Sequence, residues 1–132
     1  MDQALTDYLR NTTAIAALVG ERIDWALRPQ GSALPALGLT VVSRVPVDSD
    51  EGDSGLSTAR VQADCWAASM TEAKALAKAL RLTLSGQHFQ SLDVTFDVWT
   101  ETETDYPAQI DKGGTTIHRV SIDYLINFIE QE

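Results

Sequence analysis

The sequence predicts an α+β fold in which a mainly antiparallel β-sheet has helices packed on one face. Patterns along the 132 residues read as two short helices, three strands, one long helix and two strands. Polar loops join most of the strand segments and only one helix interrupts them, which favours antiparallel neighbours. A chain of this length supports one hydrophobic core, so we expect a single domain over residues 1–132.

Two short helices and a short strand are expected first. Apolar side chains recur at helical spacing over residues 2–10, and Asn-Thr-Thr at 11–13 interrupts this pattern because these residues favour helix caps. A second helix is expected over 14–19, where a glycine follows. Residues 23–25 then read as a short strand, and 28–35, with two prolines, read as a loop.

The next two strands flank an acidic segment. Residues 37–45 are rich in β-branched side chains, and Pro46 is expected to end that strand. Residues 48–55 contain four acids and no apolar side chain, which predicts an exposed loop. Residues 56–66 resume as a strand in which apolar and polar side chains alternate.

A long helix is predicted from its cap and its apolar stripe. Ser69 and Glu72 fit a capping box, in which each side chain satisfies an exposed amide of the other residue. The apolar residues that follow share one side of the helix, and Gly86 is expected to end it. They are Met70, Ala73, Leu76, Ala77, Leu80 and Leu84.

The last two strands show regular alternation. Residues 92–100 alternate apolar and polar side chains, 102–114 read as a polar loop, and a final strand runs over 116–128. Leu125 and Ile129 make the far end of this strand apolar on both faces. Such an end is either covered by a helix on one face or buried against another chain.

Charge and composition exclude several classes of protein. Ten Lys and Arg stand against nineteen Asp and Glu, a formal net charge of −9, and most of the cations are scattered singly. We therefore expect no specific nucleic-acid binding and no binding to a membrane. A lone cysteine and the lack of a signal-like or bilayer-length apolar run fit synthesis in a reducing cytoplasm.

The sequence carries no recognisable motif for catalysis or metal binding. Its two histidines are far apart, Cys65 stands alone, and neither a nucleophile elbow nor a phosphate-binding loop is found. The acidic segment fails the EF-hand pattern, because the sixth and twelfth positions from Asp48 are Asp53 and Ala59. We expect no catalytic residue, no metal, no cofactor and no enzymatic activity.

Two tryptophans stand out because each falls on the polar face of its strand or at the end of the strand. Trp66 and Trp99 are large aromatic side chains that a monomer would gain little from exposing. Two explanations stay open for them, an intersubunit contact and packing under a loop.

Several segments, in the same order along the chain, resemble the tail completion, or tail terminator, family of long-tailed bacteriophages and gene transfer agents. They are AIAALVGERI at 14–23, QGSALP at 30–35, ARVQADCWAA at 59–68 followed by TEAKALA at 71–77, and the strand at 116–128. The segment that leads from strand to helix is fairly specific. The chain departs from the family at 11–13, where an Asp-Pro break is common.

The resemblance implies a small structural subunit that forms a hexameric ring on the head-proximal end of a phage tail tube. The ring would end polymerisation of the tube and offer the surface on which the head connector docks. The implied partners are further copies of this chain, the tail tube protein and a head–tail connector or stopper protein. The subunit would be made in the host cytoplasm and reside in the tail or neck of the virion.

Within such a ring, apolar strand ends and the two tryptophans are expected to supply the contacts between subunits. These residues are Trp66, Trp99, Leu125, Ile126, Phe128 and Ile129. The acidic residues Asp48, Asp50, Glu51 and Asp53 are expected to face the channel, where they would repel DNA phosphates, or to dock on a neighbouring ring.

Two alternative functions stay open. A head-completion stopper, or another neck protein, also forms rings of small acidic subunits and differs in the partner on which it docks. A small-ligand binding module belongs to a different class and would need a pocket lined by polar side chains.

Overall fold

The computed structural model describes residues 1–25, 33–49, 52–110 and 113–130. Three helices and six strands are formed in these ranges. In chain order they are α1 (Asp2–Arg10), α2 (Thr13–Val19), β1 (Ile23–Trp25), β2 (Ala36–Ser49), β3 (Gly52–Ala67), α3 (Met70–Leu84), β4 (His88–Ser91), β5 (Val94–Ile110) and β6 (Thr116–Glu130).

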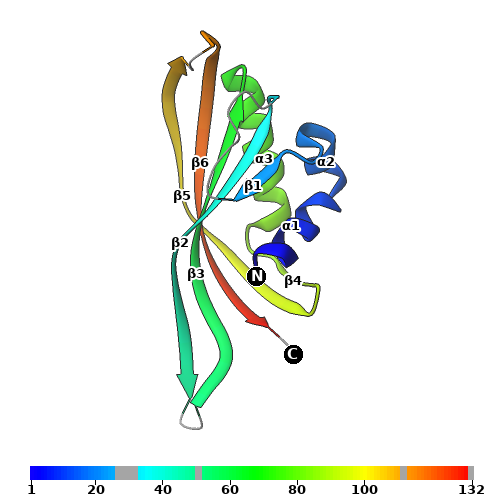
Figure 1. The fold of residues 1–132 in the computed structure, drawn as a ribbon, viewed down its shortest axis with the longest axis vertical. Coiled ribbons are helices and arrows are strands. Elements are labelled where there is room, and N and C mark those ends of the chain that lie inside the picture. Colours follow the sequence, from blue (N-terminus) through cyan, green and yellow to red (C-terminus); the bar gives the residue numbers. More distant parts are fainter. Residues whose placement is uncertain (26–32, 50–51, 111–112, 131–132) are drawn as a thin grey trace.

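The six strands form one sheet in the order β1-β2-β3-β6-β5-β4. Every neighbouring pair is antiparallel except β1 and β2, which are parallel. The sheet is strongly curled, and the three helices lie together on one side of it (Figure 1). The predicted α+β fold, mainly antiparallel with helices on one face, is thus confirmed. Two long hairpins, β2–β3 and β5–β6, project at opposite ends of the molecule (Figure 1).

The long helix α3 has one of the two hydrogen bonds of the predicted capping box. The backbone N–H of Glu72 donates to Ser69 Oγ at 3.2 Å, which satisfies one of the free amides of the first turn. At the other end, Gly86 adopts a φ of +67°, which glycine tolerates at little cost because it has no Cβ. Its N–H donates to the carbonyl of Val98 at 2.9 Å, which ties the end of α3 to β5.

The core lies between α3 and the covered face of the sheet. One alternating set of β6 side chains is buried there, and its members are Val120, Ile122, Tyr124, Ile126 and Phe128. Stacked rings continue this core toward α1. The rings of Tyr8 and Phe89 lie 3.7 Å apart, and those of Phe89 and Phe96 lie 4.8 Å apart, measured between centroids. Burial of this alternating set explains why the alternation in β6 is visible in the sequence.

The strands are longer than the sequence suggests, and four expectations were wrong. Pro46 does not end β2, which continues to Ser49. Residues 48–49 and 52–55, expected as loop, belong to β2 and β3, and Asp48 pairs with Asp53. Residues 102–110, expected as loop, belong to β5, and β4 was not expected. A proline is tolerated at Pro46 because β2 is an edge strand there, with no partner on its outer side among the described residues.

Candidate functional site

The surface of interest is the face of the sheet that the helices leave uncovered. Cross-strand partners on this face form a row in which Arg60 of β3 pairs with Leu125 of β6, and Leu125 pairs with Trp99 of β5. Four residues along β6, beyond Asn127, Ile129 lies on the same face. Trp99 is 47% exposed and Ile129 40% exposed, and Leu125 is half-buried. We call Trp99, Leu125 and Ile129 the apolar patch.

The structure divides the six predicted interface residues into three groups. Trp99 and Leu125 are cross-strand neighbours in the apolar patch, and Ile129 lies on the same face beyond the polar pair of Thr58 and Asn127. Ile126 and Phe128 point to the opposite face and are fully buried in the core of the subunit, so they leave no surface for another chain. Trp66 lies on the uncovered face but farther along β3. On the covered face, the far end of β6 is therefore buried by the core of its own subunit and not by another chain.

A cluster of aromatic and charged side chains occupies the uncovered face near Trp66. The Arg119 guanidinium carbon lies 3.9 Å from the centroid of the Tyr106 ring, which is a cation–π geometry. Arg119 Nε lies 3.7 Å from Asp64 Oδ1, to which Gln62 Nε2 also donates at 3.2 Å. Cross-strand register unites these residues, since Trp66 and Tyr106 both pair with Arg119.

This cluster was not predicted from the sequence. The sequence does carry a signal for it. Polar residues alternate with apolar ones in β3 and β6, and this alternation places Asp64 and Arg119 on the face opposite the core. The missing information was the strand order, because β3 and β6 lie far apart in sequence and become neighbours only in the sheet. Tyr106 was not placed because its segment was expected to be a loop.

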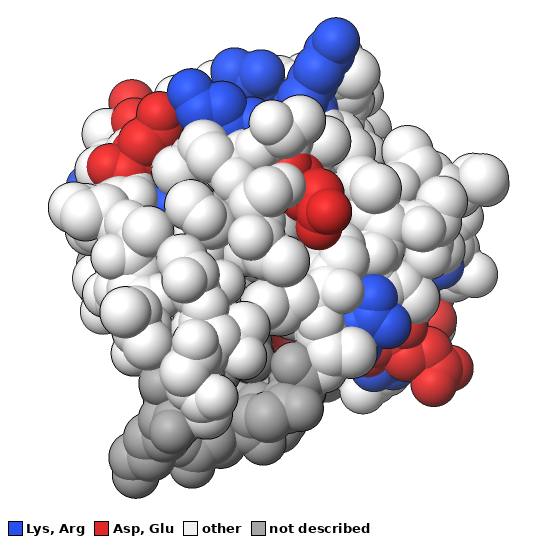
Figure 2. Space-filling view, turned by 90° about the horizontal axis from the view of Figure 1, so that it is seen from above, with Lys and Arg blue, Asp and Glu red and all other residues white. Residues whose placement is uncertain are grey.

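Three acids of β5 each contact a cation of the same subunit. Glu103 and Asp105 face α3, where Arg81 lies 3.6 Å and Lys74 2.9 Å away. Glu101 lies 2.7 Å from Arg60 on the other side of the strand. In the view along the long axis, basic and acidic side chains accordingly lie next to one another (Figure 2). These contacts hold the outer half of β5 against α3 and β3.

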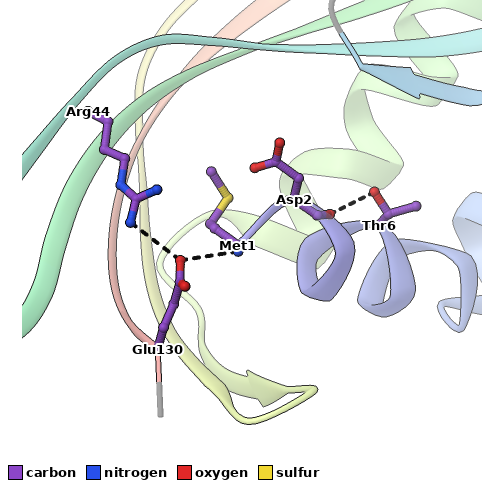
Figure 3. A network of polar contacts seen from close by, with 5 residues as sticks. All are labelled: Met1, Asp2, Thr6, Arg44 and Glu130. Carbon is purple, nitrogen blue, oxygen red and sulfur yellow. Dashed lines mark hydrogen bonds and ion pairs between the residues drawn. The ribbon is translucent and has the colours of Figure 1, made fainter. Parts of the chain in front are cut away.

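Another ionic contact joins the end of β6 to β2 and α1. Glu130 Oε1 lies 3.3 Å from the amino nitrogen of Met1 and 3.5 Å from an Arg44 nitrogen (Figure 3). In the first turn of α1, Thr6 Oγ1 donates to the Asp2 carbonyl at 2.8 Å. The strand segment that carries Ile129 is thereby fastened to the helix layer directly beyond the apolar patch.

Two of the four predicted channel or docking residues belong to the β2–β3 hairpin. Asp48 and Asp53 are backbone partners near the ends of the two strands. Asp50 and Glu51 lie outside the described residues.

No group of three or more metal-ligating side chains is found among the residues that the structure describes. Cys65 is buried on the covered face, and this burial, followed by the charge of Asp64, raises the pKa of its thiol. Burial also raises the pKa of Tyr124, next to it in the core. Both groups are neutral at physiological pH, and a neutral buried thiol is a poor nucleophile. No helix in the described part of the chain is long and apolar enough to cross a membrane.

Comparison with known proteins identifies the family. The family model described as "Tail completion protein gp17" matches residues 3–126. The chain belongs to this family. The resemblance seen in the sequence is thereby confirmed, and this tail completion protein is a structural protein of a bacteriophage tail. No curated protein matches the sequence.

Solved structures share the fold of this tail completion protein. A chain of the virion of a native gene transfer agent particle superposes with a TM-score of 0.73 at 19% sequence identity, covering 98% of this chain and 94% of that one. A second solved chain superposes with a TM-score of 0.58 at 16% identity, covering 99% of this chain and 91% of that one. The curled sheet with its layer of helices is therefore found in a virion component of known structure.

Proposed function

We propose that this protein forms a closed ring, of six subunits, that caps the head-proximal end of the phage tail tube. The ring ends polymerisation of the tube and offers the surface on which the head connector docks. Membership of the tail completion family over nearly the whole chain is the observation that carries this proposal. In this proposal the ring is a structural part of the tail and catalyses no reaction.

The apolar patch supports contacts between subunits. An exposed tryptophan beside Leu125, with Ile129 further along the same face and the Arg60–Glu101 ion pair at the edge, has the composition of an interface centre with a polar rim. We place Trp99, Leu125 and Ile129 in the contact between neighbouring subunits, with Trp66 at its edge. A closed ring buries this patch in every copy, whereas a free subunit exposes it to water.

The acidic tip of the β2–β3 hairpin is assigned to the channel of the ring. Six copies of Asp48, Asp50, Glu51 and Asp53 lining a pore would repel DNA phosphates and let the genome pass without binding. Replacing the four residues with lysine should then slow or trap ejection of DNA. Unchanged ejection kinetics would refute the channel assignment and leave docking on a neighbouring ring.

Deletion of the gene from its phage or prophage tests the biological function. Electron microscopy of the lysate should show DNA-filled heads beside separate tails, some of them longer than normal. Heads that have lost their DNA would instead identify a head-completion stopper. Normal infectious particles would overturn the tail function altogether.

A pair of variants tests the interface on the purified protein. Ile129→Ser should reduce the fraction of rings seen by analytical ultracentrifugation and electron microscopy, because it removes apolar area from the patch. Leu82→Ser is the matched control, since Leu82 is 72% exposed on α3 and lies outside the patch. Equal ring fractions for the two variants would contradict the assignment, provided that both melt at the wild-type temperature.

A further inference from the structure

Two long strand edges have no neighbour in the part of the chain that the structure describes. On one side of the sheet, β1 pairs only with the stretch from Leu37 to Leu39 of β2. On the other side, β4 pairs only with the stretch from Val94 to Asp97 of β5. The parts of β2 and β5 beyond these stretches have no such partner among the described residues as far as Pro46 and Pro107. We call residues 40–45 the β2 edge and residues 99–106 the β5 edge.

Backbone groups on both edges point away from the sheet. Leu37 donates its N–H outward to the Arg22 carbonyl at 2.9 Å, so alternation directs the N–H of Val41 outward too, beyond the end of β1. Val98 donates its N–H outward to the Gln87 carbonyl at 3.0 Å, so the N–H of Thr100 points outward in the same way. Each edge therefore presents donors and acceptors to which another strand can bind.

The position of the edges suits two copies placed end to end. The β2 edge leads to one tip of the molecule and the β5 edge to the other (Figure 1). The two strands cross the middle of the sheet in opposite directions, β2 toward the lower tip and β5 toward the upper tip (Figure 1). When two copies have the same orientation along the long axis, β2 of one copy is therefore antiparallel to β5 of the next, as strand pairing in such a sheet requires. This contact is head-to-tail and repeats from copy to copy.

Charge selects this combination of edges. The β5 edge carries Glu101, Glu103 and Asp105, so pairing β5 with β5 would place like charges opposite one another. The β2 edge has no acid and one cation, Arg44, which is half exposed and contacts Glu130 of its own subunit. Its exposed Val42 and Val45 also give it apolar side chains that pairing would cover. Pairing β2 with β2 would leave the β5 edge of every copy open.

The length of the edges limits the contact. Pro46 and Pro107 follow the two edges and cannot donate a backbone hydrogen bond. Register shifts between Val41 and Ser43, and between Thr100 and Thr102, add a bulge to each edge. Bulges and prolines are the usual means by which proteins prevent unlimited pairing of strand edges. The rotation between neighbouring copies then decides whether this head-to-tail contact closes into a ring.

We propose that the β2 edge of one subunit pairs with the β5 edge of its neighbour and extends the sheet from copy to copy. This inference rests on the proposed ring and adds the mode of contact to it. The partner is a second copy of this chain, and the recognition combines backbone hydrogen bonds with the absence of acids on the β2 edge, which avoids repulsion from the acids of the β5 edge.

Amide hydrogen exchange in rings and in diluted free subunits tests the pairing. Peptides covering the β2 edge and the β5 edge should both exchange at least about tenfold more slowly in the ring, because their outward N–H groups become bonded. Peptides from α1 should exchange equally in both states. Rings without protection at either edge would overturn the pairing and leave the ring proposal intact. Protection of the β2 edge alone would also overturn it, in favour of β2–β2 contact.

Opposite charges at one position supply an independent test. Val42 is 54% exposed on the β2 edge, and Val42→Glu should lower the ring fraction about fivefold below that of Val42→Lys, because glutamate faces the acids of the neighbour. Leu82→Glu controls for added negative charge away from both edges. Equal ring fractions for the two Val42 variants would refute the pairing. Failure of the wild-type protein to assemble at any concentration would overturn both the ring and the pairing.

Discussion

The contact between Gly38 and Trp66 gives the most specific prediction about the uncovered face. Gly38 lies on β2 directly under the ring of Trp66, which reaches across from β3. A Cβ at this position would lie 2.3 Å from Trp66 Cζ3 and 2.7 Å from Cη2. Replacing Gly38 with alanine must therefore move the indole ring or the backbone of β2.

The size of the effect follows from this overlap. Carbon atoms in contact normally lie about 3.5–4.0 Å apart, so the ring must move by roughly 1 Å or more. Overpacking of this kind costs about 1–3 kcal/mol, and the smaller conformational entropy of an unfolded chain with alanine returns about 0.4–1 kcal/mol. We expect Gly38→Ala to lower the free energy of unfolding by about 1–2 kcal/mol. For a domain of this size, that corresponds to a fall in Tm of about 4–8 °C.

A double-mutant cycle with Trp66→Ala separates the clash from a general effect on β2. Without the indole ring, Gly38→Ala should be neutral or stabilise the protein by about 0.4–1 kcal/mol. Urea unfolding of the four proteins measures the coupling free energy directly. If Gly38→Ala cost the same free energy with and without Trp66, the ring contact would not be the cause and the reasoning would be wrong.

Three further predictions concern the rest of the subunit. Ser69→Ala should lower the free energy of unfolding by about 1 kcal/mol, measured by urea unfolding, because the Glu72 amide loses its cap, whereas Ser69→Asp should retain most of the stability. The Cys65 thiol should react with a thiol reagent only after denaturation, and stability should fall above about pH 9, where the unfolded chain releases a proton that the folded chain retains; fast reaction of the folded protein would contradict its burial. The Lys74–Asp105 ion pair is exposed, so a double-mutant cycle should give a coupling below about 1 kcal/mol that weakens with salt.

Residues with one buried face were the part of the fold that could be predicted. Contact with the core explains the helical spacing in α1 and α3 and the alternation in β6. The cap at Ser69 was visible because it depends on local sequence alone. Burial imposes a period of 3.6 or 2 on such segments, and the period is visible without a structure. The prediction of helices on one face of an antiparallel sheet rests on these segments.

The outer half of β5 could not be predicted for the opposite reason. Its side chains from Trp99 to Ile110 lie at the margin of the helix layer, where Glu103 and Asp105 reach cations of α3, and all except Tyr106 are exposed. With neither face in the core, no apolar period is required, and the run of threonines and acids reads as a loop. The strand is held by pairing with β6, which depends on residues far away in sequence.

The candidate site shows the same division within one strand. Ile126 and Phe128 are as apolar as Leu125 and Ile129, so composition could not tell the core from the surface. Alternation predicts two faces, but it does not say which of them the helices cover. That choice depends on the side of the sheet to which the chain returns after β3, where α3 packs against β3 and β6.

The exposed strands also bear on why the molecule has this shape. Ordering a residue costs about 1–2 kcal/mol of backbone entropy, which buried apolar area normally offsets. The outer half of β5 buries little area in the free subunit and instead uses ion pairs to α3 and β3 that contribute little individually. A strand maintained at such cost, with one edge open and its apolar side chains exposed, gains its main stabilisation when a second strand pairs with it. If so, exchange protection and thermal stability should rise together on assembly, most strongly at the β2 and β5 edges.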